Sequence, residues 1–380
     1  MLLLASAAAT LTSLPAARAG YLEPEASERV RNDQWHLGYL RVADAHRISQ
    51  GAGITVAVPD TGVDPHPDLH RNLLPGIDVI PGGSGDGRRD PNGHGTGMAG
   101  LIAAHGRGES RGALGIAPKA KILPIVDAPP DGNGHADSLA QSIKFAVEEG
   151  ADIISISSGG GGSEQLRQAV RSALASNVII VAGVGNYPRD SRVSYPASEP
   201  DVIAVGGVDR TGKRAAVSVT GVEVDVVAPG VDIYSTSRDG RYRKGTGTSD
   251  STAIVAGAVA LIRSRFPDLP ASEVAHRLTA TAVDKGPPGR DDQYGYGVID
   301  LVAALTADVP PLGFGSATAS APATGAPSTT AVAHPGDDGD RQATVRGWVT
   351  LGVLVAAGTA WALIARHRRR SDDPPPRISR

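Results

Sequence analysis

The chain of 380 residues is long enough for one large domain or two smaller ones with additional tails. Its 37 basic and 40 acidic side chains nearly balance, so nothing indicates nucleic acid as a partner. Cysteine is absent, which excludes disulfides and thiolate chemistry. Hydrophobic residues make up 41% of the chain but aromatic residues only 4%, so the core must consist of Val, Ile, Leu and Ala, and this favours buried, mostly parallel strands.

The N-terminus has the pattern of an export signal. Residues 1–19 are small and apolar, and Ala17-Arg18-Ala19 before Gly20 has the Ala-x-Ala form of a cleavage site. We therefore predict a signal peptide at 1–19, although the usual basic opening segment is missing; a buried N-terminal helix is the alternative. Residues 20–50 follow as a charged N-terminal extension without a clear period, which we expect to be ordered only if it packs on the next domain.

Near the C-terminus, residues 347–365 form an uncharged run with Trp348 and Trp361 near its ends. As a helix this run would measure about 28 Å, close to the thickness of the hydrocarbon core of a bilayer. Four arginines follow it: Arg366, Arg368, Arg369 and Arg370. We therefore predict a transmembrane helix at 346–366 and a basic cytoplasmic tail at 367–380. A soluble amphipathic helix is the alternative, but no polar stripe interrupts the run.

The segment before this helix, residues 307–345, is rich in Pro, Ala, Thr and Gly. It cannot bury enough apolar surface to fold, so we predict a linker. With the C-terminus in the cytoplasm, the main domain at 51–306 would lie on the outer side of the cell membrane. The expected protein is single-pass and membrane-anchored.

The main domain alternates between strands and helices. Strands are predicted at 54–58, 121–126, 152–157 and 178–182, with shorter ones at 202–205, 215–219 and 224–228; helices are predicted from about residue 94 and at 136–149, 164–175 and 253–262, the last followed by a further element at 272–280. Alternating strands and helices form parallel βαβ units, so we predict an α/β fold with a mostly parallel central sheet.

Chemistry in such a fold gathers at the carboxyl ends of the strands. Asp60 follows the first predicted strand, and Asn186 follows the strand at 178–182. His94 stands between two glycines at the start of a helix, and Ser249 stands between a glycine-rich loop and an apolar run. A serine at the amino end of a helix lies near backbone N–H groups that can stabilise an oxyanion. Taken singly, Asp60 and Ser249 have a simpler interpretation as caps and His94 as a surface residue; together they indicate a nucleophile with its base.

Three motifs carry a family resemblance: Val58-Pro59-Asp60-Thr61-Gly62, Asn92-Gly93-His94-Gly95-Thr96 and Gly247-Thr248-Ser249. Their residues and their order, aspartate before histidine before serine, resemble the catalytic motifs of the subtilisin-like serine proteases, the subtilases of peptidase family S8. The resemblance covers about residues 35–306 and implies the subtilisin-like three-layer fold.

The resemblance also implies roles for individual residues. Ser249 would attack a peptide carbonyl, His94 would accept and return its proton, and Asp60 would orient the imidazole. Asn186 would donate to the oxyanion together with the backbone N–H of Ser249. The run Ser157, Ser158 and Gly159 is similar to the substrate-binding strand of the family, which pairs with extended peptide backbone.

The order of the segments narrows the resemblance to the mycosins, the membrane-anchored proteases associated with type VII secretion in actinobacteria. This resemblance implies an extracytoplasmic endopeptidase that hydrolyses secreted proteins or peptides through an acyl-enzyme, with membrane components of the secretion system as partners. The alternative is a subtilase-fold scaffold subunit that stabilises a secretion complex while its catalysis is weak or dispensable.

The chain departs from the family pattern beside the nucleophile. Asp250 and Ala253 stand where methionine and proline are common, and Pro59 stands where an aliphatic residue is usual. An ionised Asp250 would oppose the charge that develops on the oxyanion and raise the pKa of His94, so low activity or an altered pH dependence is expected.

No cofactor is predicted. Subtilases often bind calcium, and Asp284 and Asp291-Asp292 lie in acidic loops, but the chain has neither the spacing of an EF-hand nor a cluster of His and Cys. We therefore predict no metal site and regard these charges as solvated.

Overall fold

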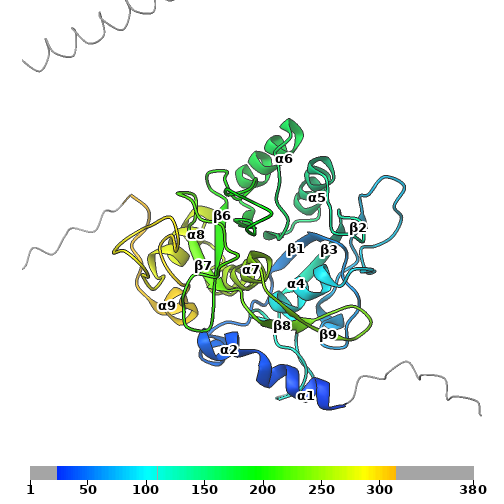
Figure 1. The fold of residues 1–380 in the computed structure, drawn as a ribbon, viewed down its shortest axis with the longest axis horizontal. Helices are drawn as coiled ribbons and strands as arrows, with labels where there is room; N and C mark the ends of the chain where they lie inside the picture. Colours follow the sequence, from blue (N-terminus) through cyan, green and yellow to red (C-terminus); the bar gives the residue numbers. More distant parts are fainter. Residues whose placement is uncertain (1–23, 109, 314–380) are drawn as a thin grey trace, which may run out of the picture. The chain divides into compact units, whose positions relative to one another are not determined.

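A seven-stranded parallel sheet forms the centre of the computed structural model, which describes residues 24–108 and 110–313 (Figure 1). The strands lie in the order β2 (Ile77–Asp78), β3 (Lys121–Val126), β1 (Thr55–Asp60), β4 (Ile153–Ile156), β5 (Ile179–Gly183), β6 (Ile203–Val208) and β7 (Val226–Pro229). Every pair of neighbours is parallel. The predicted α/β fold with a mostly parallel sheet is confirmed.

Helices cover both faces of this sheet (Figure 1). They are α4 (His94–Ala103) and α7 (Thr248–Arg265) on one face, and α5 (Ala136–Glu148) and α6 (Glu164–Ala175) on the other. Successive side chains of a strand point to opposite faces. In β1, Val56 therefore belongs to the apolar cluster of α4 and α7, whereas Ala57 belongs to that of α5 and α6. The fold has three layers, as the resemblance implied.

The helix α7 is buried on all sides from Thr248 to Arg263, so it has no polar stripe. It begins before the predicted apolar run 253–262, which places Ser249 and Asp250 in its first turn. Its amino end follows the short loop after Gly245, and the unpaired N–H groups of its first turn lie at the site described below.

Three short helices precede the sheet: α1 (Pro24–Asp33), α2 (Trp35–Tyr39) and α3 (Val42–His46). The Gln34 amide donates to the carbonyl oxygen of Leu114 at 3.0 Å, and the Trp35 indole N–H donates to that of Val231 at 3.1 Å. The described part of the N-terminal extension thus packs on the main domain, as we expected for an ordered extension. The remaining elements are η1 (His70–Asn72), the antiparallel hairpin of β8 (Ile233–Thr236) and β9 (Tyr242–Gly245), α8 (Ala271–Ala280) and α9 (Leu301–Thr306).

The predicted strand at 215–219 is wrong. The Ser218 N–H donates to the carbonyl oxygen of Ala215 at 2.9 Å, which is a turn, and Ser218 forms only an isolated bridge with Asn186. The physical reason is that β6 already has β5 and β7 as neighbours, so neither of its edges is open to a further strand.

Within the residues that the structure describes, no helix is both long and apolar enough to cross a bilayer. The predicted signal peptide at 1–19 and the transmembrane segment at 346–366 lie outside the described residues, as does the linker beyond residue 313.

Candidate active site

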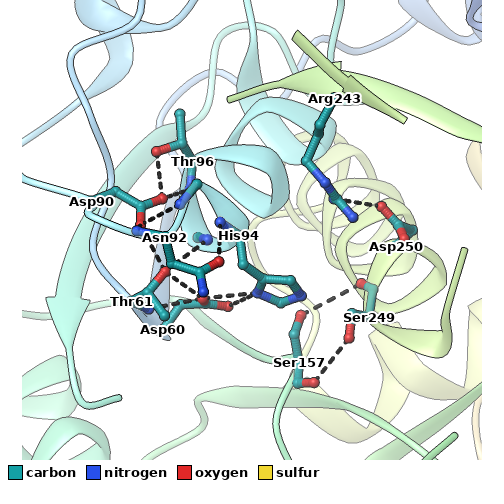
Figure 2. Close-up of polar contacts among 12 residues, drawn as sticks. Asp60, Thr61, Asp90, Asn92, His94, Thr96, Ser157, Arg243, Ser249 and Asp250 are labelled. Carbon is teal, nitrogen blue, oxygen red and sulfur yellow. Dashed lines mark hydrogen bonds and ion pairs between the residues drawn. The ribbon is translucent and has the colours of Figure 1, made fainter. Parts of the chain in front are cut away.

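Strand β1 and helix α4 bring Asp60 and His94 together (Figure 2). Asp60 ends β1 and His94 begins α4. The Nδ1 atom of His94 lies 2.9 Å from both carboxylate oxygens of Asp60. Gly95 permits this approach, because a Cβ atom there would lie 3.0 Å from the Cβ of Asp60 and closer still to the carbonyl oxygen of Gly62.

A second carboxylate, that of Asp90, holds both residues in place. Asp90 is buried, and its Oδ1 accepts hydrogen bonds from the Thr61 hydroxyl at 2.8 Å and the Gly93 N–H at 2.7 Å. Its Oδ2 accepts from the N–H and the hydroxyl of Thr96, at 2.9 and 2.7 Å. Thr61 in turn donates its N–H to Oδ1 of Asp60 at 2.8 Å. Asp90 therefore connects the strand that carries Asp60 to the helix that carries His94.

Ser249 lies in the first turn of α7, across the His94 ring from Asp60 (Figure 2). Its hydroxyl donates to the carbonyl oxygen of Ser157 at 3.1 Å, and the Ser157 hydroxyl donates to the carbonyl oxygen of Ser249 at 3.4 Å. In this structure the Ser249 hydroxyl is bonded to Ser157; catalytic hydrogen bonds are often long or poorly aligned without substrate and tighten when substrate is bound.

Asn186 lies beside the same helix end. Its Oδ1 accepts a hydrogen bond from the Thr248 N–H at 2.9 Å, which leaves the amide nitrogen as a donor in the cleft that Asn186 lines. The backbone N–H of Ser249, in the first turn of α7, is one of the donors that a helix leaves unpaired. Together these two groups could donate to an oxyanion, and the positive end of the helix dipole would add to the attraction.

A cleft of about 570 Å³ surrounds these residues. Asp60, His94, Asn186 and Ser249 all line it. The predicted substrate strand lines it too, with Ser157, Ser158 and Gly159 following β4, and Gly160 beyond them is held by an antiparallel bridge to Tyr195. All seven predicted site residues therefore meet in one cleft.

The charges in the cleft bias the ionisation of His94. The Asp60 carboxylate raises the pKa of His94, although burial lowers it. Burial raises the pKa of Asp60, but the charge and hydrogen bond of His94 outweigh burial, and the net pKa is lowered. Asp127, at the end of β3, also lines the cleft; burial, together with the charge of Asp60, raises the pKa of Asp127 well above its ordinary value.

Asp250, which follows the nucleophile, has a charged partner that its sequence context did not indicate. The Arg243 guanidinium, from β9, donates to Oδ1 of Asp250 at 2.9 Å. Burial raises the pKa of Asp250, and Arg243 and His94 act against this without overcoming it. The carboxylate beside the nucleophile is thus one half of a buried ion pair.

The comparison with protein families decides the classification, because the model of the Subtilase family, peptidase S8, matches residues 51–297. The chain is a subtilase. It is 38% identical over 272 residues to Subtilisin BL of Lederbergia lenta, covering 71% of this chain and 97% of that protein. It is 36% identical to the minor extracellular protease Epr of Bacillus subtilis, of which the match covers only 42%.

Solved structures extend this comparison to the mycosins. The crystal structure of MycP1 with its N-terminal propeptide removed has a TM-score of 0.64 and 32% identity, and the match covers 73% of this subtilase and 98% of that chain. MycP1 from Mycobacterium smegmatis has a TM-score of 0.65 and 31% identity, covering 85% of that chain. The resemblance that the motifs indicated is confirmed.

The geometry supports the acyl-transfer chemistry of a serine endopeptidase. In such a reaction Ser249 Oγ would attack the carbonyl carbon, His94 would accept the hydroxyl proton, and Asp60 would stabilise the resulting imidazolium. The oxyanion would accept hydrogen bonds from Asn186 and the Ser249 N–H. His94 would then give the proton to the leaving amine, and a water molecule would attack the acyl-enzyme with His94 as its base, which releases the acid product and restores the Ser249 hydroxyl.

Two functional residues were missed by sequence reasoning. Asp90 precedes Pro91-Asn92-Gly93, a turn sequence just before the helix of His94, so a capping role was the available signal. Arg243 had no such signal, because its contact with Asp250 depends on how β9 folds against α4 and α7.

No group of three or more His, Cys, Asp or Glu side chains that could hold a metal ion occurs in the described part of the subtilase. The acidic loop residues considered for calcium shape their own loops instead. Asp284 accepts a hydrogen bond from the Gly289 N–H at 2.8 Å, and Asp291 accepts one from the Gln293 N–H at 2.7 Å.

Proposed function

We propose that this subtilase is a membrane-anchored mycosin that cleaves secreted proteins or peptides on the outer side of the cell membrane, in association with a type VII secretion system. The observation that carries the proposal is the match to MycP1, which covers 98% of one solved chain and 73% of this one. One of the matching structures is described as MycP1 from the ESX-1 type VII secretion system.

The two ends support the proposal by their composition. Residues 1–19 have the apolar character and the Ala-x-Ala ending of an export signal. Residues 347–365 are uncharged and are followed by arginines, the arrangement of a single anchor with a cytoplasmic tail. Such an anchor would hold the cleft close to proteins as they leave the membrane.

A fluorophosphonate probe tests the catalytic part, because it phosphonylates only an activated serine. We expect labelling of the full-length protein in the membrane fraction, none in Ser249→Ala, and labelled protein in the soluble fraction when the chain ends at residue 313. Protease added to intact cells should digest the labelled domain. Labelled full-length protein in the cytosol would refute the anchored, outward-facing arrangement.

The second candidate function is a scaffold subunit in a secretion complex. Two observations favour it: Asp250 stands where the family commonly has methionine, and the Ser249 hydroxyl is bonded to Ser157 rather than to His94. Secretion in a strain that carries Ser249→Ala, compared with a strain that lacks the gene, separates the two functions. Secretion that survives Ser249→Ala but not deletion would make the scaffold the main role.

A further inference from the structure

The ion pair between Arg243 and Asp250 lies in the wall of the catalytic cleft. Both residues line the cleft, and Figure 2 shows them on the opposite side of the His94 ring from Ser157. The Asp250 side chain is 2% exposed and that of Arg243 is 22% exposed. A carboxylate this deeply buried, one residue from the nucleophile, is costly to keep charged without a partner.

The surrounding backbone leaves a place for the arginine. Gly97 of α4 faces the Arg243 side chain, and a Cβ atom there would lie 2.7 Å from Cδ and 2.8 Å from Nη1, the atom that binds Asp250. Gly245, at the end of β9, has no side chain where the other guanidinium nitrogen lies. Two glycines on different elements thus give Arg243 a defined position between α4 and α7.

Charged groups from three elements act on the catalytic histidine. Asp60 of β1 raises the pKa of His94, Arg243 of β9 lowers it, and Asp250 of α7 raises it. Asp127, which follows β3, also lines the cleft, but burial and the charge of Asp60 raise its own pKa well above the ordinary value. Arg243 and Asp250 therefore act with opposite signs on the same imidazole. The same two charges also oppose each other at the oxyanion, which forms beside the first turn of α7.

We propose that Arg243 is a positioning residue, which pairs with Asp250 so that the carboxylate next to the nucleophile adds no net charge to the catalytic site. Arg243 acts through Asp250, to which its guanidinium donates at 2.9 Å. The proposal rests on the peptidase activity but not on the role in secretion. It explains how the chain can carry a carboxylate where the family commonly has methionine.

The test is the rate at which Ser249 of the full-length protein is phosphonylated by a fluorophosphonate, measured across pH. The variants are Arg243→Met, Asp250→Met and the double variant; at position 243 methionine keeps a long side chain without the charge, and at position 250 it is the residue that the family commonly has. Arg243→Lys, which keeps the charge, is the matched control, and Ser249→Ala checks the activity itself.

In Arg243→Met we expect the rate above neutral pH to fall on the order of tenfold or more, since an uncompensated negative charge then faces the oxyanion. The pH at which the rate falls to half should move up in Arg243→Met and down in Asp250→Met. The double variant should recover most of the loss, and Arg243→Lys should stay near the wild type. Opposite shifts of the two single variants would not arise from a merely structural role.

A double variant no faster than Arg243→Met, or Arg243→Met with the rate and profile of the wild type, would overturn the proposal. Labelling of the Asp250→Met variant but not of the wild type would also overturn it, because Asp250 would then silence the site despite its partner. If Arg243→Met does not fold, the profile of Asp250→Met decides, since a shift upward or no shift contradicts the proposal. Labelling of Ser249→Ala would instead contradict the assigned nucleophile.

Discussion

Replacement of Asp90 by asparagine tests how firmly the His94 helix is held. Asparagine has the shape of aspartate, but it must turn an NH₂ group toward one set of donors. In its better orientation the oxygen keeps the bonds from Thr61 and Gly93, and the amide faces Thr96. The Thr96 hydroxyl can rotate to accept from it, whereas the buried Thr96 N–H loses its acceptor.

One buried, unsatisfied N–H costs about 1–3 kcal/mol, and each bond that remains loses roughly half of its charge-assisted strength. We therefore expect Asp90→Asn to lower the free energy of unfolding by about 2–5 kcal/mol and to reduce activity, because the His94 helix is no longer tied to Thr61. Denaturant unfolding of the two proteins measures the first effect and peptidase assays the second.

Asp131→Asn is the matched control, because Asp131 accepts a hydrogen bond from the Asn133 N–H at 3.0 Å in an exposed turn. It should change stability by less than about 0.5 kcal/mol. An Asp90→Asn protein as stable as this control would refute the argument that Asp90 connects β1 to α4.

Further predictions concern the base, the oxyanion site and the packing of α7. Because the Asp60 carboxylate raises the pKa of His94, kcat/KM should fall with decreasing pH at a midpoint above the ordinary histidine pKa of about 6.5, which a pH–rate profile would show. The stability that the ion pair of His94 and Asp60 contributes should be fully present below about 6.5 and lost as the pH rises through the raised pKa, which a pH–stability profile would show. A midpoint below 6.5 would contradict the first part. Asn186→Ala should lower kcat about 10²–10³-fold with little change in KM, the loss known for such a donor in subtilisin. Gly257→Ala should lower the free energy of unfolding by about 1–3 kcal/mol, because the new Cβ would lie 2.6 Å from the Cβ of buried Ile116. The control Gly38→Ala in α2, where a Cβ would have no atom within 4 Å, should leave stability unchanged or raise it slightly in the same denaturation assay.

The alternation of strands and helices and the catalytic residues were predictable, because both are local features of the sequence. Asp60 ends a strand, Asn186 follows one, and His94 and Ser249 begin helices, so a parallel sheet brings all four to one edge. The predicted strand at 215–219 failed because hydrophobic alternation does not reveal whether a sheet edge is free.

Arg243 and the hairpin of β8 and β9 could not be predicted for a related reason. The strand residues 242–245 read Tyr-Arg-Lys-Gly, with no apolar period, and the hairpin is held to α4 by tertiary bonds. The Ser235 hydroxyl donates to the carbonyl oxygen of Gly97 at 2.7 Å, and the Thr236 hydroxyl donates to the carbonyl oxygen of Thr96 at 2.6 Å. Only the folded chain brings Arg243 and Asp250 together.

The carboxylate beside the nucleophile also bears on how the enzyme responds to oxidants. A thioether next to Ser249 would be converted to a polar sulfoxide by peroxide, which alters the catalytic site. Here Asp250 occupies that position, the chain has no cysteine, and its two methionines are Met1 and Met98. Met98, on α4, is fully buried. Hydrogen peroxide should therefore leave the rate of Ser249 labelling unchanged, so that treated and untreated protein react equally fast with the fluorophosphonate.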